Sequence, residues 1–286
     1  MDEFTAALRA REFIRKLNRN TIPASIDAYV QQAGGVLRLE TDLGPDEPGY
    51  SFENNGKHYI CVNGNDPAPR RRFTACHEIA HIVLGLPSDH GSAPWWSYAK
   101  RSPDEICCDV FAAELLLPHR VFEPLVERAE IGFSAIDELR SRFEASTIAT
   151  GSRFAMVISA PCAFVLSEQG KVRYASRSKA LRDAAAWISP QASLPSGSTS
   201  ARVRTGANPN GAEKVAADLW FSDWNRGGVL CEEARHLHRR DQTLTLLWFE
   251  DEEVPPFRRG ICAEDENLGL EELDGILPWP GKRRRR

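Results

Sequence analysis

The chain has 286 residues, of which 42% are hydrophobic and 27% are charged, and its formal net charge at pH 7 is -4. These values are typical of a folded globular protein and exclude a fibrous or wholly disordered chain. The net charge is slightly negative, and five of the basic residues in the second half form the terminal run, so no broad basic face indicates direct nucleic-acid binding.

The compartment can be inferred from the first residues and from the cysteines. The opening MDEFTAALRA carries acidic side chains where a secretory signal would be basic and then apolar, and no apolar run approaches the length of a membrane span. The seven cysteines are odd in number and include the vicinal pair Cys107-Cys108, which is a poor disulfide framework. We therefore expect a cytoplasmic protein with reduced thiols and no membrane contact. The sequence does not indicate an oligomeric state.

The first 130 residues combine helical periodicity with two short strand-like runs. Capping and proline signals mark the ends of two helices in the middle of this region. In chain order, we predict helices over residues 2–19 and after Pro23, strands over 36–40 and 58–64, a helix that begins at Asp66-Pro67 and continues to Leu84, a helix from Ser102-Pro103 to Leu117, and a helix over 118–129.

The remaining chain changes from helical to strand-like character near residue 155. Two short helical stretches come first and can be read as a helix-turn-helix-like module. The predicted elements are helices over residues 134–143 and 146–154, strands over 155–159, 162–167, 171–176, 218–224 and 243–251, and a long polar loop over 191–211.

One motif carries chemistry: His77-Glu78-Ile79-Ala80-His81, an H-E-x-x-H sequence on a predicted helix. The four-residue spacing places the two imidazoles on one helix face, within reach of a single tetrahedral zinc ion. Glu78 can then act as general base for the attacking water and pass the proton to the leaving amine. The alternative is a pair of hydrogen-bonded core histidines. The metal is favoured because the helix is apolar on nearly all sides, where three unpartnered polar side chains would be costly.

A catalytic zinc usually takes a third protein ligand. Glu105 and Asp109 lie four residues apart on the next predicted helix and can share a face. Glu105 could instead complete a capping box that begins at Ser102. Cys107 and Cys108 are also able ligands, although thiolates would better suit a structural or sensor site. Spacing alone leaves these alternatives open.

The stretch RRFTACHEIAHIVLG, followed after a loop by EICCDVFAAELLLP, resembles the ImmA/IrrE family of metallo-endopeptidases. In that family the third ligand is a glutamate thirteen residues before the closing proline, a position that Glu105 occupies here. The match has departures. Cys76 stands where the family usually has alanine, and Cys107-Cys108-Asp109 replaces the common Glu-Ala-Asn. Asp109 therefore stays open as a ligand or as an acceptor for a histidine N–H.

This resemblance implies a zinc-dependent site-specific endopeptidase that cleaves a helix-turn-helix transcriptional repressor in a stress or mobile-element response. The alternative is a zinc-containing anti-repressor that sequesters its partner without cutting it. The expected fold is α+β, with a zincin-like metallopeptidase domain followed by a strand-rich domain that senses a signal or presents substrate. The expected parts are residues 1–130 (zincin-like domain), 131–155 (helix-turn-helix-like module), 156–281 (C-terminal α+β domain) and 282–286 (basic tail).

Several other features allow a plain and a functional interpretation. We expect ion pairs for the arginines that open the motif helix, and helix packing rather than DNA contact for the helix-turn-helix-like module. The tryptophans between the two metal helices could form a lid, but loop packing is favoured. The residues concerned are Arg70, Arg71, Arg72, Trp95, Trp96 and nearby Tyr98, together with His236 and His238, which could bind metal only with a third partner.

Overall fold

The computed structural model describes residues 1–17, 21–87 and 102–250. It is an α+β fold in which a small three-stranded sheet and its helices precede a five-stranded antiparallel sheet. This confirms the expected fold class. Within the described ranges, no helix is both long and apolar enough to cross a membrane.

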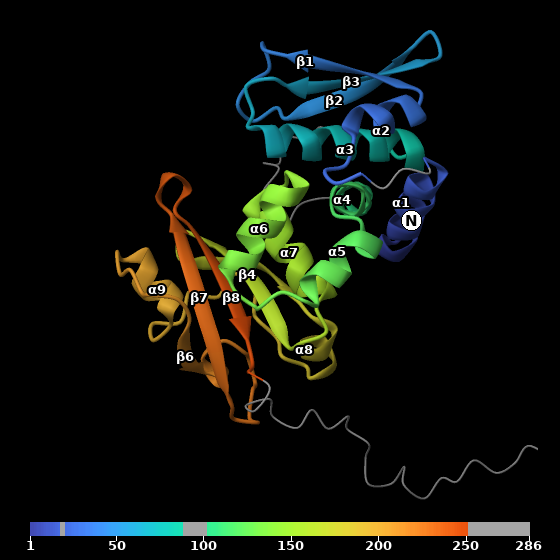
Figure 1. Cartoon of the computed structure of the whole chain (residues 1–286). Helices are drawn as coiled ribbons and strands as arrows, with labels where there is room; N and C mark the ends of the chain where they lie inside the picture. The colour runs from blue at the N-terminus through green and yellow to red at the C-terminus, as the bar shows by residue number, and fades with distance from the viewer. Residues whose placement is uncertain (18–20, 88–101, 251–286) are drawn as a thin grey trace, which may run out of the picture.

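The first part of the chain builds a sheet on one side of a long helix, α3, and packs a second helix, α4, against α3 (Figure 1). The sheet order is β1-β3-β2, with β1 parallel and β2 antiparallel to the central β3. The elements are α1 (Glu3–Lys16), α2 (Ile26–Gln32), β1 (Gly35–Glu40), β2 (Gly49–Asn54), β3 (Lys57–Asn63), α3 (Ala68–Leu84), α4 (Pro103–Leu116) and α5 (His119–Val126).

Strand β2 was not among the predicted elements, although it is the edge of the sheet nearest the motif. It begins at Gly49, which pairs with Val62 of β3. A Cβ atom at Gly49 would come within 2.5 Å of the Cys61 carbonyl oxygen and 2.7 Å of the Thr74 methyl group on α3. Glycine is therefore required for β2 to lie this close to α3.

Helix α3 begins one residue later than predicted, because Pro67 rather than Asp66 is its N-cap. Asp66 instead forms an ion pair with Arg70 at 3.0 Å. Arg72 pairs with Glu144 at 3.3 Å, so the ion-pair expectation holds for these two arginines. The helix ends at Gly85, whose φ of 66° is a left-handed conformation that favours glycine.

The second part of the chain is led by two helices and continues as the sheet β5-β4-β8-β7-β6. Three predicted elements were wrong: residues 155–159 end a helix or follow it, 218–224 hold a 3-10 turn, and 191–211 contain α9. Strands β6 and β7 and the short helix α8 were missed. The elements are α6 (Phe133–Phe143), α7 (Thr147–Val157), β4 (Cys162–Glu168), β5 (Lys171–Arg177), α8 (Lys179–Asp183), α9 (Thr199–Arg204), β6 (Glu213–Ala216), β7 (Val229–Leu237) and β8 (Gln242–Trp248).

Helix α7 is held in the core and does not present a free recognition face. Thr150, Gly151, Arg153 and Phe154 are all buried, and the helix packs on β4 and β5. One hydrophobic cluster continues from Phe111 of α4 through Phe154 to Phe164 of β4. The second helix of the helix-turn-helix-like segment therefore packs into the core, in line with the expected helix packing.

Gly151→Ala is expected to destabilise the fold by about 1–3 kcal/mol, the usual range for overpacking a core. A Cβ atom at this position would overlap the ring of the buried Phe164. Urea unfolding measures the loss. Gly197→Ala is the matched control, since its new methyl would meet only the Leu219 side chain at 3.8 Å. An unfolding free energy equal to that of the control would contradict the proposed close packing.

Candidate metal centre

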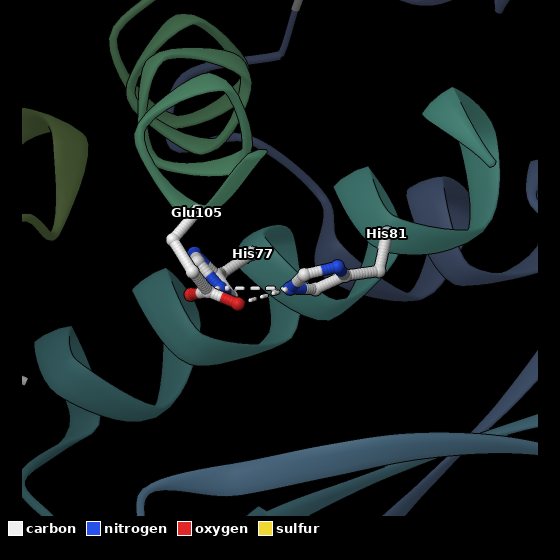
Figure 2. Close-up of side chains that lie close together, drawn as sticks. All are labelled: His77, His81 and Glu105. Atoms are coloured by element: carbon white, nitrogen blue, oxygen red, sulfur yellow. Dashed lines mark hydrogen bonds and ion pairs between the residues drawn. The ribbon is translucent and has the colours of Figure 1, made fainter. Parts of the chain in front are cut away.

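Two imidazoles and one carboxylate meet between α3 and α4 (Figure 2). The Nε2 atoms of His77 and His81 are 3.1 Å apart. Glu105 places Oε2 3.1 Å from His77 Nε2 and Oε1 3.4 Å from His81 Nε2. The ligand atoms of the three residues lie within 4.8 Å of one another, and both histidines are buried. The structure thus brings together the motif histidines and the glutamate that the sequence favoured.

The spacing of these atoms fits a metal ion. Ligands about 2.0–2.1 Å from a tetrahedral ion are about 3.3 Å from one another, close to the distances between the histidine and Glu105 atoms. Imidazole nitrogen and carboxylate oxygen are donors that zinc and related divalent ions accept. His77, His81 and Glu105 could therefore hold such an ion with only small adjustments.

The Nδ1 atom of each imidazole has its own partner. This contact fixes the ring so that Nε2 faces the space between the two histidines and Glu105. His77 Nδ1 lies 3.0 Å from Asp109 Oδ1, and His81 Nδ1 lies 3.3 Å from the Leu86 carbonyl oxygen. Such outer contacts orient metal-binding histidines and increase their basicity. Asp109 thus lies on the far side of His77 and does not belong to the three-residue group.

Glu105 is directed to the histidines and does not act as the side chain of a capping box. Its backbone N–H donates to the Ser102 hydroxyl at 3.3 Å, so Ser102 is the N-cap of α4. The Glu105 carboxylate turns toward the histidines rather than back to the helix start. Burial works to raise the pKa of Glu105, but hydrogen bonds from His77 and His81 outweigh burial and hold this pKa well below its usual range. The carboxylate is therefore ionised, as a metal ligand must be.

The cysteines do not join the three-residue group. All six in the described part of the chain are free and buried. Cys108 Sγ lies 3.5 Å from His81 Nδ1. Burial strongly raises the pKa of Cys108 and raises that of Cys76 to about 12, which keeps both as neutral thiols.

Glu78 lies beside the histidines and is also buried, with 3% of its surface exposed. The Ser51 hydroxyl donates a hydrogen bond to its Oε2 at 2.7 Å. Sequence reasoning missed Ser51 because it missed strand β2. The alternation of aromatic and small residues in Gly49-Tyr50-Ser51-Phe52 is a strand signal that could have found it.

A buried ion pair holds the other end of α4. Glu114 is 1% exposed and pairs with Arg153 of α7 and with Arg11 of α1, the latter at 3.2 Å. Its Oε1 also accepts a hydrogen bond from the His119 backbone N–H at 2.9 Å. These contacts fix α4, and with it Glu105, relative to α1 and α7.

The sequence offered two further groups of candidate residues. Trp95, Trp96 and Tyr98 lie outside the described residues. The rings of His236 and His238 are 4.7 Å apart, and His236 Nδ1 is 3.0 Å from the Thr243 hydroxyl. Across the described ranges, the only group of three or more ligand side chains within metal-binding distance is the one on α3 and α4.

Comparison with known proteins gives a family for part of the chain and a solved structure of similar fold. Residues 31–155 match the family model described as the IrrE N-terminal-like domain, Peptidase_M78. A solved structure of a Mycobacterium tuberculosis transcriptional regulator has a similar fold, with a TM-score of 0.59 and 12% sequence identity over 87% of this chain and 77% of that chain. No curated protein matches the chain.

Proposed function

Because residues 31–155 form a domain of the ImmA/IrrE family of peptidases, we propose that the chain is a zinc-dependent endopeptidase that cleaves a helix-turn-helix transcriptional repressor. The observation that carries this proposal is the convergence of His77, His81 and Glu105 with a fourth side chain, Glu78, beside them. A metal site without a general base would suit a structural or sequestering protein. The buried Glu78 carboxylate next to the ligands suits a hydrolytic one.

In the proposed reaction, His77, His81 and Glu105 hold the ion. Zinc, when bound, supplies a Lewis acid that polarises the scissile carbonyl and makes water more acidic. Glu78 accepts a proton from the attacking water and donates it to the leaving amine. Asp109 and the Leu86 carbonyl keep the two imidazoles in the orientation that binding requires.

The proposal that the substrate is a repressor comes from the family resemblance. The solved structure of similar fold is called a transcriptional regulator, which fits the general theme of transcription control. We assign to the C-terminal sheet a role in sensing a signal or presenting the substrate. Repressor cleavage would relieve repression in a stress or mobile-element response.

The test is to examine whether a neighbouring gene encodes a helix-turn-helix repressor, to mix that repressor with the purified, zinc-loaded chain, and to analyse the products by mass spectrometry. The proposal expects a single cut in the repressor that a chelator prevents. A tight complex in which the repressor stays intact would instead identify a sequestering anti-repressor. If the chain neither cuts nor binds the repressor, the repressor is not its target.

Asp109→Asn is expected to weaken zinc binding by about 10–100-fold, the usual effect of removing an outer partner of a metal-binding histidine. The reason is that the amide keeps the contact to His77 Nδ1 but loses the negative charge that makes the imidazole more basic. Competition with a chromophoric chelator measures the affinity. Asp104→Asn on the same helix is the control. Unchanged affinity would contradict the role of Asp109, and complete loss of zinc would make it a ligand.

A further inference from the structure

We propose that Ser51 is the positioning residue for the general base, holding the Glu78 carboxylate so that one oxygen faces the reacting water. This inference rests on the proposed function and adds a residue outside the motif helix to it. Ser51 belongs to β2, a different element from the two helices that carry the metal group.

The first support is the hydrogen bonding of Glu78. The Ser51 hydroxyl donates to Oε2 at 2.7 Å, a good distance for a bond to a charged oxygen. Within residues 1–17, 21–87 and 102–250, this hydroxyl is the one side chain that hydrogen bonds to the Glu78 carboxylate. The bond holds Oε2 toward β2, and Oε1 accepts no side-chain hydrogen bond within these ranges. A single donor therefore sets the rotation of the carboxylate.

The second support is the way the sheet fixes the position of Ser51. Neighbouring residues of a strand point to opposite faces. Tyr50 and Phe52 stack on each other with ring centroids 6.0 Å apart, and Phe52 stacks on Tyr59 of β3 at 5.1 Å. These rings occupy the face of the sheet away from α3, so Ser51 between them faces α3.

The third support is the short distance between β2 and α3. Gly49, two residues before Ser51, leaves no side chain between the strand and Thr74, which lies one turn before Glu78. A bulkier residue at Gly49 would force β2 away from the helix. The glycine and the stacked rings thus place a short side chain, serine, within hydrogen-bond distance of a buried carboxylate.

Loss of this bond should reduce turnover rather than binding. A displacement of about 1 Å in a catalytic group can cost roughly 100-fold in rate. We expect Ser51→Ala to lower kcat by about 10–100-fold, with KM and zinc stoichiometry unchanged. Ser51→Thr keeps the hydroxyl and suits a strand, so it should restore most of the turnover.

The experiment compares zinc-loaded wild type, Ser51→Ala and Ser51→Thr, with Ser176→Ala as the control. Ser176 is a half-buried serine on β5, the edge strand of the other sheet. The readouts are kcat and KM on the repressor, bound zinc per chain, and crystal structures that show the Glu78 side chain. We expect a single Glu78 conformer in wild type and Ser51→Thr. In Ser51→Ala we expect the Glu78 side chain to be displaced or to adopt several conformers.

Two outcomes separate this inference from the proposed function. Full turnover by Ser51→Ala with one undisturbed Glu78 conformer would overturn the role of Ser51 while leaving the peptidase intact. A wild-type chain that holds zinc but never cuts would overturn the peptidase. The Glu78 conformers in the crystal structures would still decide whether Ser51 positions this carboxylate.

Discussion

Glu78→Gln is expected to bind zinc as the wild-type chain does and to cleave the repressor about 100- to 10,000-fold more slowly, the range that general base catalysis contributes. The amide has the size of the carboxylate, and its oxygen can still accept the hydrogen bond from Ser51. It cannot accept a proton from water. The rate of repressor cleavage and the zinc content of the same sample are the two measurements.

The matched control for this variant is Glu53→Gln, which changes an exposed glutamate on β2 near the same site. It should cut at the wild-type rate. If Glu78→Gln also cuts at that rate, Glu78 is not the base and the proposed mechanism is wrong. If both wild type and Glu78→Gln bind the repressor without cutting, the chain acts by sequestration.

His81→Ala is expected to lose both zinc and cleavage. His81 supplies one of three converging ligand atoms, and its Nε2 lies within 3.4 Å of the other two. Removal of a direct ligand should weaken zinc binding by more than the roughly 100-fold that an outer partner costs. A ligand that binds only the folded state raises its stability, by about 2.7 kcal/mol at 100 times its dissociation constant. Zinc should therefore raise the melting temperature of the wild type and leave that of His81→Ala unchanged.

His236→Ala is the control for this second variant, because it removes a histidine of the other close pair, on the C-terminal sheet. It should keep one zinc per chain and the stabilisation that zinc gives. A His81→Ala chain that binds one zinc with wild-type affinity would place the metal elsewhere and remove the basis of the proposed chemistry.

The metal group could be predicted from sequence because helical periodicity determines it. Four residues separate His77 from His81, and one regular helix brings their side chains to one face. The role of Glu105 was harder to predict, since both a capping box and a metal site could explain a glutamate at this position. In the structure Ser102 caps α4 by accepting from the Glu105 backbone N–H, and the Glu105 carboxylate faces the histidines instead of the helix start.

The strands were less predictable because short apolar runs do not distinguish strand from helix or turn. Residues 155–157 continue α7, and Trp220 and Phe221 are buried beside a 3-10 turn although their run suggested a strand. Their burial comes from tertiary packing, which periodicity does not encode. Strand β7 was missed for a related reason. Its sequence VLCEEARHL contains charged residues that do not suggest a buried strand, and Glu232 is buried because it accepts hydrogen bonds from Ser200 and Trp220.

Edge strand β2 shows where sequence reasoning failed with most effect on function. It has 6 residues, and the alternation of small and aromatic side chains that marks it as a strand covers only the first four. It nevertheless supplies Ser51, the hydrogen-bond partner of Glu78. The H-E-x-x-H motif therefore identifies the base, whereas the contact that orients the base depends on a strand outside the motif.

The most direct test of the account is to strip the metal from the chain and add zinc back in steps while following repressor cleavage. A zinc-dependent endopeptidase should show no cutting by the apo chain. Its rate should rise in proportion to zinc up to one ion per chain, with a single cut site throughout. Cleavage by the metal-free chain, or a fully loaded chain that leaves the repressor intact, would contradict it.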